Sequence, residues 1–227
     1  MTERVLSEWR RRVAAEYRSA ALAAQVSHWM IQCGLDEALI HTALRIVRDE
    51  LDHASLAHDC LVAMGGEDTP SPVEIGHLAE PAQAGVLPDL VTSITRNFCL
   101  GETLAVPLFG AMRRHTTHPE ARSVLTRILK DESIHRAFGW DALDALLRLD
   151  ADGVRQRVSA QLPDLIAGFE RSYAGAPGDG RLLDSERAAG LISLSEYAQV
   201  FWDTLEGDIR RRFETRGIVM KVKPVAS

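Results

Sequence analysis

Two stretches of the chain repeat the pattern Asp-Glu-x-x-His, at residues 49–53 and 131–135. Each lies in a run whose apolar spacing predicts an α-helix, on which residues three apart share a face. Each pattern therefore predicts one carboxylate and one imidazole that point to the same side of a helix. These pairs are Glu50 with His53 and Glu132 with His135. Two such pairs, with one glutamate from each of two further helices, hold two metal ions in four-helix bundles.

The repetition exceeds what composition predicts. Requiring Asp directly before Glu-x-x-His gives about 0.04 expected copies in a chain with this content of Asp, Glu and His. A third Glu-x-x-His, Glu74 to His77, lacks the Asp, contains Gly76 and follows Pro70 and Pro72. We interpret this third copy as a chance occurrence.

The first helix should supply a glutamate at the depth of the first pair. In an antiparallel helix pair, equal depth means equal distance from the connecting turn. Glu16 stands eighteen residues before the predicted turn at Gly34, and Glu50 stands sixteen residues after it. Glu16 is therefore the expected ligand, with Glu8 and Glu3 as alternatives on the same helix.

The third helix should supply the remaining glutamate. Glu102 stands fifteen residues before the turn at Thr117, and Glu132 stands fifteen residues after it. The neighbours Leu100 and Leu104 make the surroundings of Glu102 apolar. A buried carboxylate is costly unless it is paired or bound to a metal. Glu102 is therefore the second expected single ligand.

Asp49 and Asp131 are expected to support the histidines. A metal-bound imidazole usually donates its other N–H to a carboxylate, which fixes its tautomer and orientation. When the two helices face each other, the Asp of one pattern lies near the His of the other. We therefore expect Asp49 to contact His135 and Asp131 to contact His53.

Residues one turn from the expected ligands should line a substrate pocket, and they are small or apolar. Pro107 removes a backbone hydrogen-bond donor and is expected to open this space or to serve packing. The predicted lining residues are Ser19, Ala20, Ala23, Ala105, Val106 and Phe109.

The apolar periodicity predicts an all-α protein. Short turns, a long broken crossover over residues 66–88 and another short turn give the connectivity of a ferritin-like four-helix bundle. We expect one domain over residues 1–227, with a four-helix core over 5–150 and two additional C-terminal helices over 154–216. The six helices are predicted at about 5–33, 36–64, 89–114, 119–149, 154–173 (interrupted or restarted near Pro163) and 184–216.

Composition limits the possible partners. The formal net charge is −6 and the pI about 5.8, which disfavour nucleic acid or an anionic membrane as the main partner. No signal peptide and no apolar run of membrane-spanning length is evident, so we expect a cytoplasmic protein. Cys33, Cys60 and Cys99 are expected to be free thiols.

The expected ligand set favours particular metals. Four carboxylates and two imidazoles form a hard, oxygen-rich site that suits two iron or manganese ions better than copper(I) or structural zinc. Such a set leaves coordination positions open. We expect two iron ions, with manganese or a mixed pair as alternatives, and O₂ as co-substrate.

The ligand pattern resembles the ferritin-like di-iron carboxylate superfamily over about residues 5–150. In length and layout the chain is similar to cyanobacterial aldehyde-deformylating oxygenase, including the run from Lys130 to His135 followed by Gly139. The resemblance implies O₂-dependent oxidation at two iron ions, with electrons from a donor such as a ferredoxin or a flavoprotein reductase. It does not extend to aldehyde deformylation itself.

Three functions remain open at this stage. The favoured one is an oxygenase or oxidase acting on a small organic molecule, as a monomer or homodimer. The second is a ferroxidase or iron-storage protein resembling bacterioferritin, which the roughly seventy residues after the bundle disfavour. The third is an amine N-oxygenase similar to the aminobenzoate oxygenases, which place a further His where this chain has Ile128. A non-enzymatic helical adaptor is a further alternative.

Overall fold

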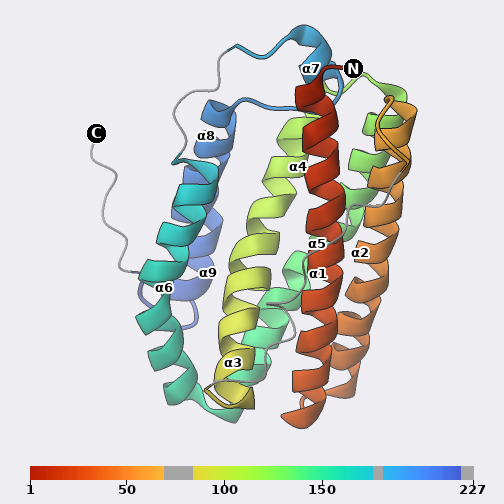
Figure 1. Cartoon of the computed structure of the whole chain (residues 1–227). Coiled ribbons are helices and arrows are strands. Elements are labelled where there is room, and N and C mark those ends of the chain that lie inside the picture. The colour runs from red at the N-terminus through yellow and green to blue at the C-terminus, as the bar shows by residue number, and fades with distance from the viewer. Residues whose placement is uncertain (69–83, 176–180, 221–227) are drawn as a thin grey trace.

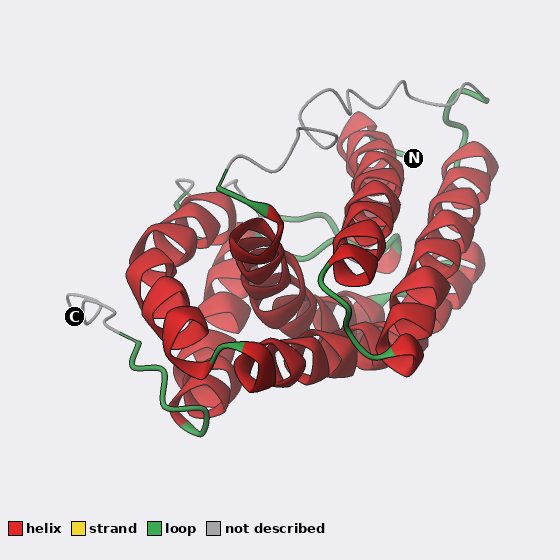
Figure 2. Ribbon diagram, turned by 90° about the horizontal axis from the view of Figure 1, so that it is seen from below, coloured by secondary structure: helices red, strands yellow, loops and turns green. Residues whose placement is uncertain are grey.

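The computed structural model describes residues 1–68, 84–175 and 181–220. Within these ranges the regular structure is helical, as the sequence predicts, and Figure 2 shows helices and loops only. Most of the predicted crossover, the third Glu-x-x-His pattern and the C-terminal tail lie outside them. Among the described helices, none combines the length and apolarity that crossing a membrane requires.

Four long helical segments run side by side (Figure 1). Helix α1 packs on α2, α2 on α5, and α5 on the third segment, which consists of three consecutive helices. The bounds are α1 Glu3–Gln32, α2 Glu37–Ala63, α3 Val86–Ser93, the π-helix η1 Ile94–Glu102, α4 Thr103–His115 and α5 Pro119–Leu149.

Local residue chemistry sets the ends of α1 and α2. The Thr2 side chain accepts a hydrogen bond from the backbone N–H of Val5, and the Asp36 side chain accepts one from Ala38. These caps satisfy N–H groups that have no partner inside a helix. Gly34 has a φ of +66°, a conformation that glycine adopts at little cost, and α1 ends just before it. The predicted turn at Gly34 is confirmed.

The third segment differs from the prediction in its start and in its middle. The helix begins at Val86 rather than near residue 89, and nine residues of it, Ile94–Glu102, are π-helical. A π-helical turn contains an extra residue, which rotates the following side chains relative to a regular α-helix. Glu102 is the last residue of the π-helix η1, and Gly101 precedes it. Apolar periodicity over one short stretch does not distinguish this geometry from an α-helix.

The C-terminal part is also more divided than predicted. Helix α6 (Ala151–Tyr173) continues through Pro163 without interruption, because a 23-residue helix tolerates one missing hydrogen bond. The predicted helix over 184–216 is divided because Gly190 has a φ of +96° and Ser193 caps a new helix. The observed elements are α7 Asp184–Ala188, α8 Leu194–Thr204, the π-helix η2 Leu205–Ile209 and α9 Arg210–Glu214.

The C-terminal helices lie against the third segment. Helix α6 packs on α3, α8 packs on α4, and α6 and α8 contact each other. Figure 1 shows α6, α8 and α9 on one side of α4, with α1 and α2 on the other side. This arrangement places aromatic residues of α6 and α8 beside the space between α1 and α4.

Close helix packing at the centre depends on one glycine. A Cβ atom on Gly139 of α5 would lie 2.7 Å from the backbone carbon of Phe98 in η1. The Cys99 thiol donates a hydrogen bond to the Gly139 carbonyl at 3.3 Å. Cys60 and Cys99 are buried, Cys33 is half-buried, and all three are free thiols, as predicted.

Candidate metal centre

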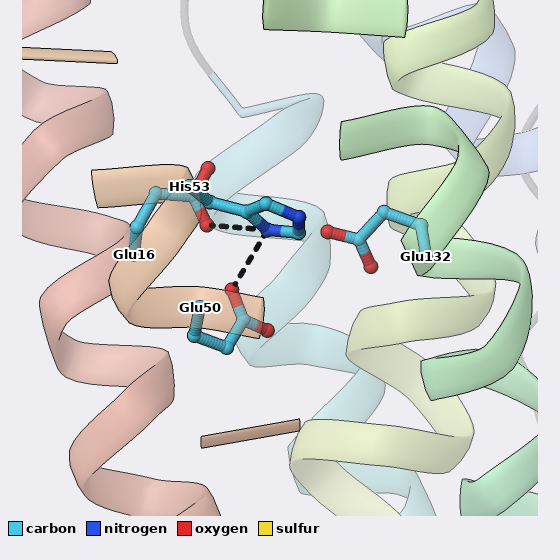
Figure 3. A group of neighbouring side chains, drawn as sticks. All are labelled: Glu16, Glu50, His53 and Glu132. Carbon is cyan, nitrogen blue, oxygen red and sulfur yellow. Dashed lines mark hydrogen bonds and ion pairs between the residues drawn. The ribbon is translucent and has the colours of Figure 1, made fainter. Parts of the chain in front are cut away.

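The structure brings the six expected ligand side chains together at mid-bundle. They form two groups, in each of which one ligand atom per residue lies within 4.8 Å of the others. The first group comes from α1, α2 and α5, and Figure 3 shows its side chains pointing toward one another. The groups are Glu16, Glu50, His53 and Glu132, and Glu50, Glu102, Glu132 and His135. Glu50 and Glu132 belong to both.

Glu50 links the two imidazoles. Its Oε2 lies 3.3 Å from Nδ1 of His53, and its Oε1 lies 3.2 Å from Nδ1 of His135. Each oxygen of one carboxylate therefore faces a different histidine, as a carboxylate that bridges two cations would. The two imidazole rings are 5.8 Å apart, centroid to centroid.

Burial makes the negative charge of the cluster costly. Both histidines have no exposed surface, and Glu16, Glu50 and Glu132 are buried, whereas Glu102 keeps partial exposure. Burial and then repulsion from neighbouring carboxylates raise the pKa of Glu16 and of Glu102 well above the usual value. These two carboxyl groups therefore keep their protons to higher pH than exposed glutamates do.

Glu50 and His135 are shifted in directions that stabilise their charged forms. Burial alone would raise the pKa of Glu50, but short contacts with the imidazoles of His135 and His53 outweigh it and lower the pKa to about 2. Burial alone would lower the pKa of His135, but contacts with Glu132 and Glu50 raise it to about 10. Protons thus balance part of the charge that cations would balance in the metal-bound protein.

Two aspartates hold the histidines from behind. Nε2 of His53 lies 3.2 Å from Oδ2 of Asp131, and Nε2 of His135 lies 3.5 Å from Oδ2 of Asp49. These are the crossed contacts expected from the sequence. Each aspartate can accept a hydrogen bond from Nε2–H, so Nδ1 faces the carboxylate cluster and would offer its lone pair to a cation that displaces the Nδ1 proton.

Two atoms at the centre have unused binding capacity. Glu132 Oε2 and His135 Nδ1 are buried, and neither makes a hydrogen bond of good geometry with a described residue, although Nδ1 lies within ion-pair distance of both Glu50 and Glu132. They lie 3.5 Å apart. Buried polar atoms normally have partners, so unpartnered ones call for an explanation. A divalent cation coordinated by both atoms fits this arrangement and the oxygen-rich ligand set.

Sequence reasoning missed a second layer of support, formed by Arg45 and Arg127. Arg127 Nε donates to Oδ2 of Asp131 at 2.5 Å, and Arg45 Nε lies 3.3 Å from Oδ2 of Asp49. Burial alone would raise the pKa of Asp131, but hydrogen bonds from Arg127 and His53 outweigh it and lower the pKa. The sequence contains a pattern that could have identified them, because in each repeat an Arg stands four residues before the Asp.

Replacing Asp131 with alanine is expected to weaken metal binding about 10–100-fold, because His53 loses the group that orients it. Isothermal titration with Mn²⁺ measures the affinity. Asp141→Ala, which removes an exposed carboxylate from the same helix, serves as the matched control and should bind as the wild type does. An Asp131→Ala affinity within twofold of wild type would contradict the supporting role.

Metal loading at pH 7 is expected to release protons. The raised pKa values of Glu16, Glu102 and His135 mean that the metal-free protein retains protons that bound cations displace. Apparent metal affinity should therefore rise with pH. Calorimetric titrations in buffers of different ionisation enthalpy count the released protons, and a value of zero would contradict the expectation.

A cavity of about 480 Å³ opens onto the cluster between α1 and the third segment. Its walls include the four glutamates of the centre and apolar side chains such as Leu108 and Phe109. Phe169 and Tyr173 of α6 and Tyr197 of α8 close it from the C-terminal side. No residue of these later helices was expected in the pocket, since nothing in their spacing links them to the candidate ligands.

Of the three residues on α1 that were expected to line a pocket, one lies on the cavity wall and two do not. Ser19 lines the cavity, but Ala20 and Ala23 do not. An α-helix turns about 100° per residue, so Ser19 lies about 60° to one side of Glu16 and Ala20 about 40° to the other. The cavity lies on the Ser19 side, and Ala20 is buried away from it.

On α4, too, the residues expected in the pocket fall on two sides of the helix. Ala105 and Phe109 line the cavity, but Val106 does not. Relative to Glu102, Ala105 and Val106 turn to opposite sides by about 60° and 40°. The cavity is thus offset to one side of the ligands on both helices. The spacing in the sequence predicts how far along each helix the candidate ligands lie, but it does not predict on which side of them the cavity lies.

Comparisons of the chain with models of protein families, with curated proteins and with solved structures found no match.

Proposed function

We propose that this protein is a non-haem di-iron oxygenase or oxidase with a ferritin-like bundle, which uses O₂ to oxidise a small organic substrate. The observation that carries the proposal is the pair of His-containing groups that share Glu50 and Glu132 and open onto a partly apolar cavity. Shared carboxylates support two adjacent ions rather than one. The cavity supports a substrate larger than a metal ion.

Each residue has a distinct role in this proposal. Glu16 and His53 would hold one ion, Glu102 and His135 would hold the other, and both ions would share Glu50 and Glu132. Bound iron would supply the electrons and open coordination positions that reduction of O₂ requires. Asp49 and Asp131 keep the imidazoles in the tautomer that leaves Nδ1 free.

The cavity walls supply substrate binding and control of water. Phe98, Phe109 and Phe169 present apolar surface next to the carboxylates. Such walls favour an organic molecule over the hydrated iron ions that a storage protein must admit. An external electron donor, such as a ferredoxin or a flavoprotein reductase, completes the proposed activity.

Anaerobic loading with Fe²⁺ followed by addition of O₂ tests the proposal. We expect about two iron ions per chain by elemental analysis, and O₂ uptake that small organic substrates accelerate. Binding of no iron, or O₂ uptake that no member of a broad substrate panel changes, would contradict it. Light scattering distinguishes the alternative function, because a hollow cage would indicate iron storage and a monomer or homodimer would indicate the enzyme.

A further inference from the structure

Arg12 is a buried cation in the cavity wall that the metal centre does not use. Its side chain is 5% exposed and lies on α1, four residues before Glu16. The guanidinium carbon lies 4.4 Å from the ring centre of Trp9 and 5.6 Å from that of Phe109. Its Nη2 lies 3.2 Å from the sulfur of Met112. These contacts fix the guanidinium in place without neutralising it.

Among the described residues no carboxylate forms an ion pair with Arg12, although its charge favours the ionised form of Glu16 one helical turn away. Nη1 of Arg12 is buried and has no hydrogen-bond partner among the described residues. Glu8 and Glu16 each stand four residues from Arg12 on the cavity wall, and Glu16 belongs to the metal centre. Both oxygens of Glu8 are engaged, because they accept hydrogen bonds from Arg11 and from the Tyr197 hydroxyl. A buried cation without a partner is costly, so a residue of this kind indicates a missing anion.

With the metal ions bound, the charged residues of the cavity wall would sum to one unbalanced positive charge. If two divalent ions bind as proposed above, the four glutamates of the centre balance them. Glu8 balances Arg11, with which it forms an ion pair. The remaining charged residue of the wall is Arg12. A monoanionic ligand would neutralise the metal-loaded cavity.

We propose that Arg12 binds the carboxylate of the substrate, so that the molecule oxidised at this centre is a small organic acid with an apolar body. The planar guanidinium matches a carboxylate in a two-point hydrogen-bonded pair. Arg12 and Glu16 are separated by one helical turn, roughly 6 Å along the axis. The acid would therefore present a carbon a few bonds from its carboxylate to the metal centre. This identification of the substrate class rests on the proposed function.

Binding of hexanoate and of hexanamide to the Mn²⁺-loaded protein tests the proposal. The two probes have similar size, but only hexanoate is charged. We expect calorimetry to show at least tenfold tighter binding of hexanoate. Arg12→Gln should weaken hexanoate binding at least tenfold, and Arg12→Lys should weaken it less. Arg18→Gln, which removes an exposed cation from the same helix, should change it by less than twofold.

The remaining outcomes separate the possibilities. Equal binding of hexanoate by wild type and Arg12→Gln would overturn the proposal and indicate direct attachment of the carboxylate to the metal. Equal binding of the two probes by the wild type would also overturn it. Melting temperatures of the variants should stay near wild type, because the contacts that Arg12→Gln loses with Trp9 and Phe109 are offset by removal of an unpaired buried charge. Elemental analysis of the same samples tests the metal centre separately: absence of metal would overturn the proposed function, while hexanoate binding that depends on Arg12 would still support the anion site.

Discussion

Replacing Glu132 with alanine is expected to remove both metal ions, whereas Glu16→Ala and Glu102→Ala are each expected to remove one. Glu132 belongs to both groups of ligands, and each of the other two belongs to a single group. Loss of a direct ligand should weaken binding by more than the roughly 10–100-fold expected for an outer contact. Elemental analysis after dialysis gives the stoichiometry, which should fall from about two per chain to near zero for Glu132→Ala.

Thermal unfolding supplies an independent measurement of the same loss. Mn²⁺ at about 100 times its Kd should stabilise the wild type by about 2.7 kcal/mol per site, and it should not stabilise Glu132→Ala. Glu120→Ala removes an exposed glutamate from the same helix and should retain both the metal and the stabilisation. Full metal content in Glu132→Ala would exclude Glu132 as a shared ligand.

The sequence was informative about the centre because the ligands obey the periodicity of the helices. Glu50 and His53 share a face of α2 because they are three residues apart, and the equivalent pair on α5 follows the same rule. Similar distances from Gly34 and equal distances from Thr117 pointed to Glu16 and Glu102, which the structure brings to the same cluster. Spacing along a helix and distance from a turn are both counts of residues along the chain, so the sequence alone provides them.

The features that sequence reasoning missed depend on tertiary structure. The π-helical geometry of η1 changes the rotation of the third segment, and the apolar pattern does not encode it. The cavity lies to one side of the ligands because α6 and α8 cover that side, and those helices are distant in sequence. A longer comparison of the repeats, over residues 45–53 and 127–135, would have identified Arg45 and Arg127. Both stretches begin with Arg-Ile and share their fifth, sixth and ninth residues.

The offset of the cavity leads to the second large effect. Ala105→Phe is expected to reduce substrate-dependent O₂ uptake at least tenfold while the protein keeps both metal ions. Ala105 lines the cavity one turn from Glu102, so an aromatic ring there would occupy the space beside the metal centre. An oxygen electrode measures uptake by the reduced, iron-loaded protein with and without small organic acids, and elemental analysis confirms the metal content.

Val106→Phe is the matched control, because it places the same ring one residue further along α4, on the side that does not line the cavity. Its substrate-dependent uptake should stay within twofold of wild type. Equal loss in both variants would mean that bulk on α4 disturbs the bundle rather than the cavity. Full activity in Ala105→Phe, with metal retained, would show that the substrate reaches the ions from another side. The comparison of adjacent positions thus tests which side of α4 the substrate occupies, which the spacing of the ligands alone does not determine.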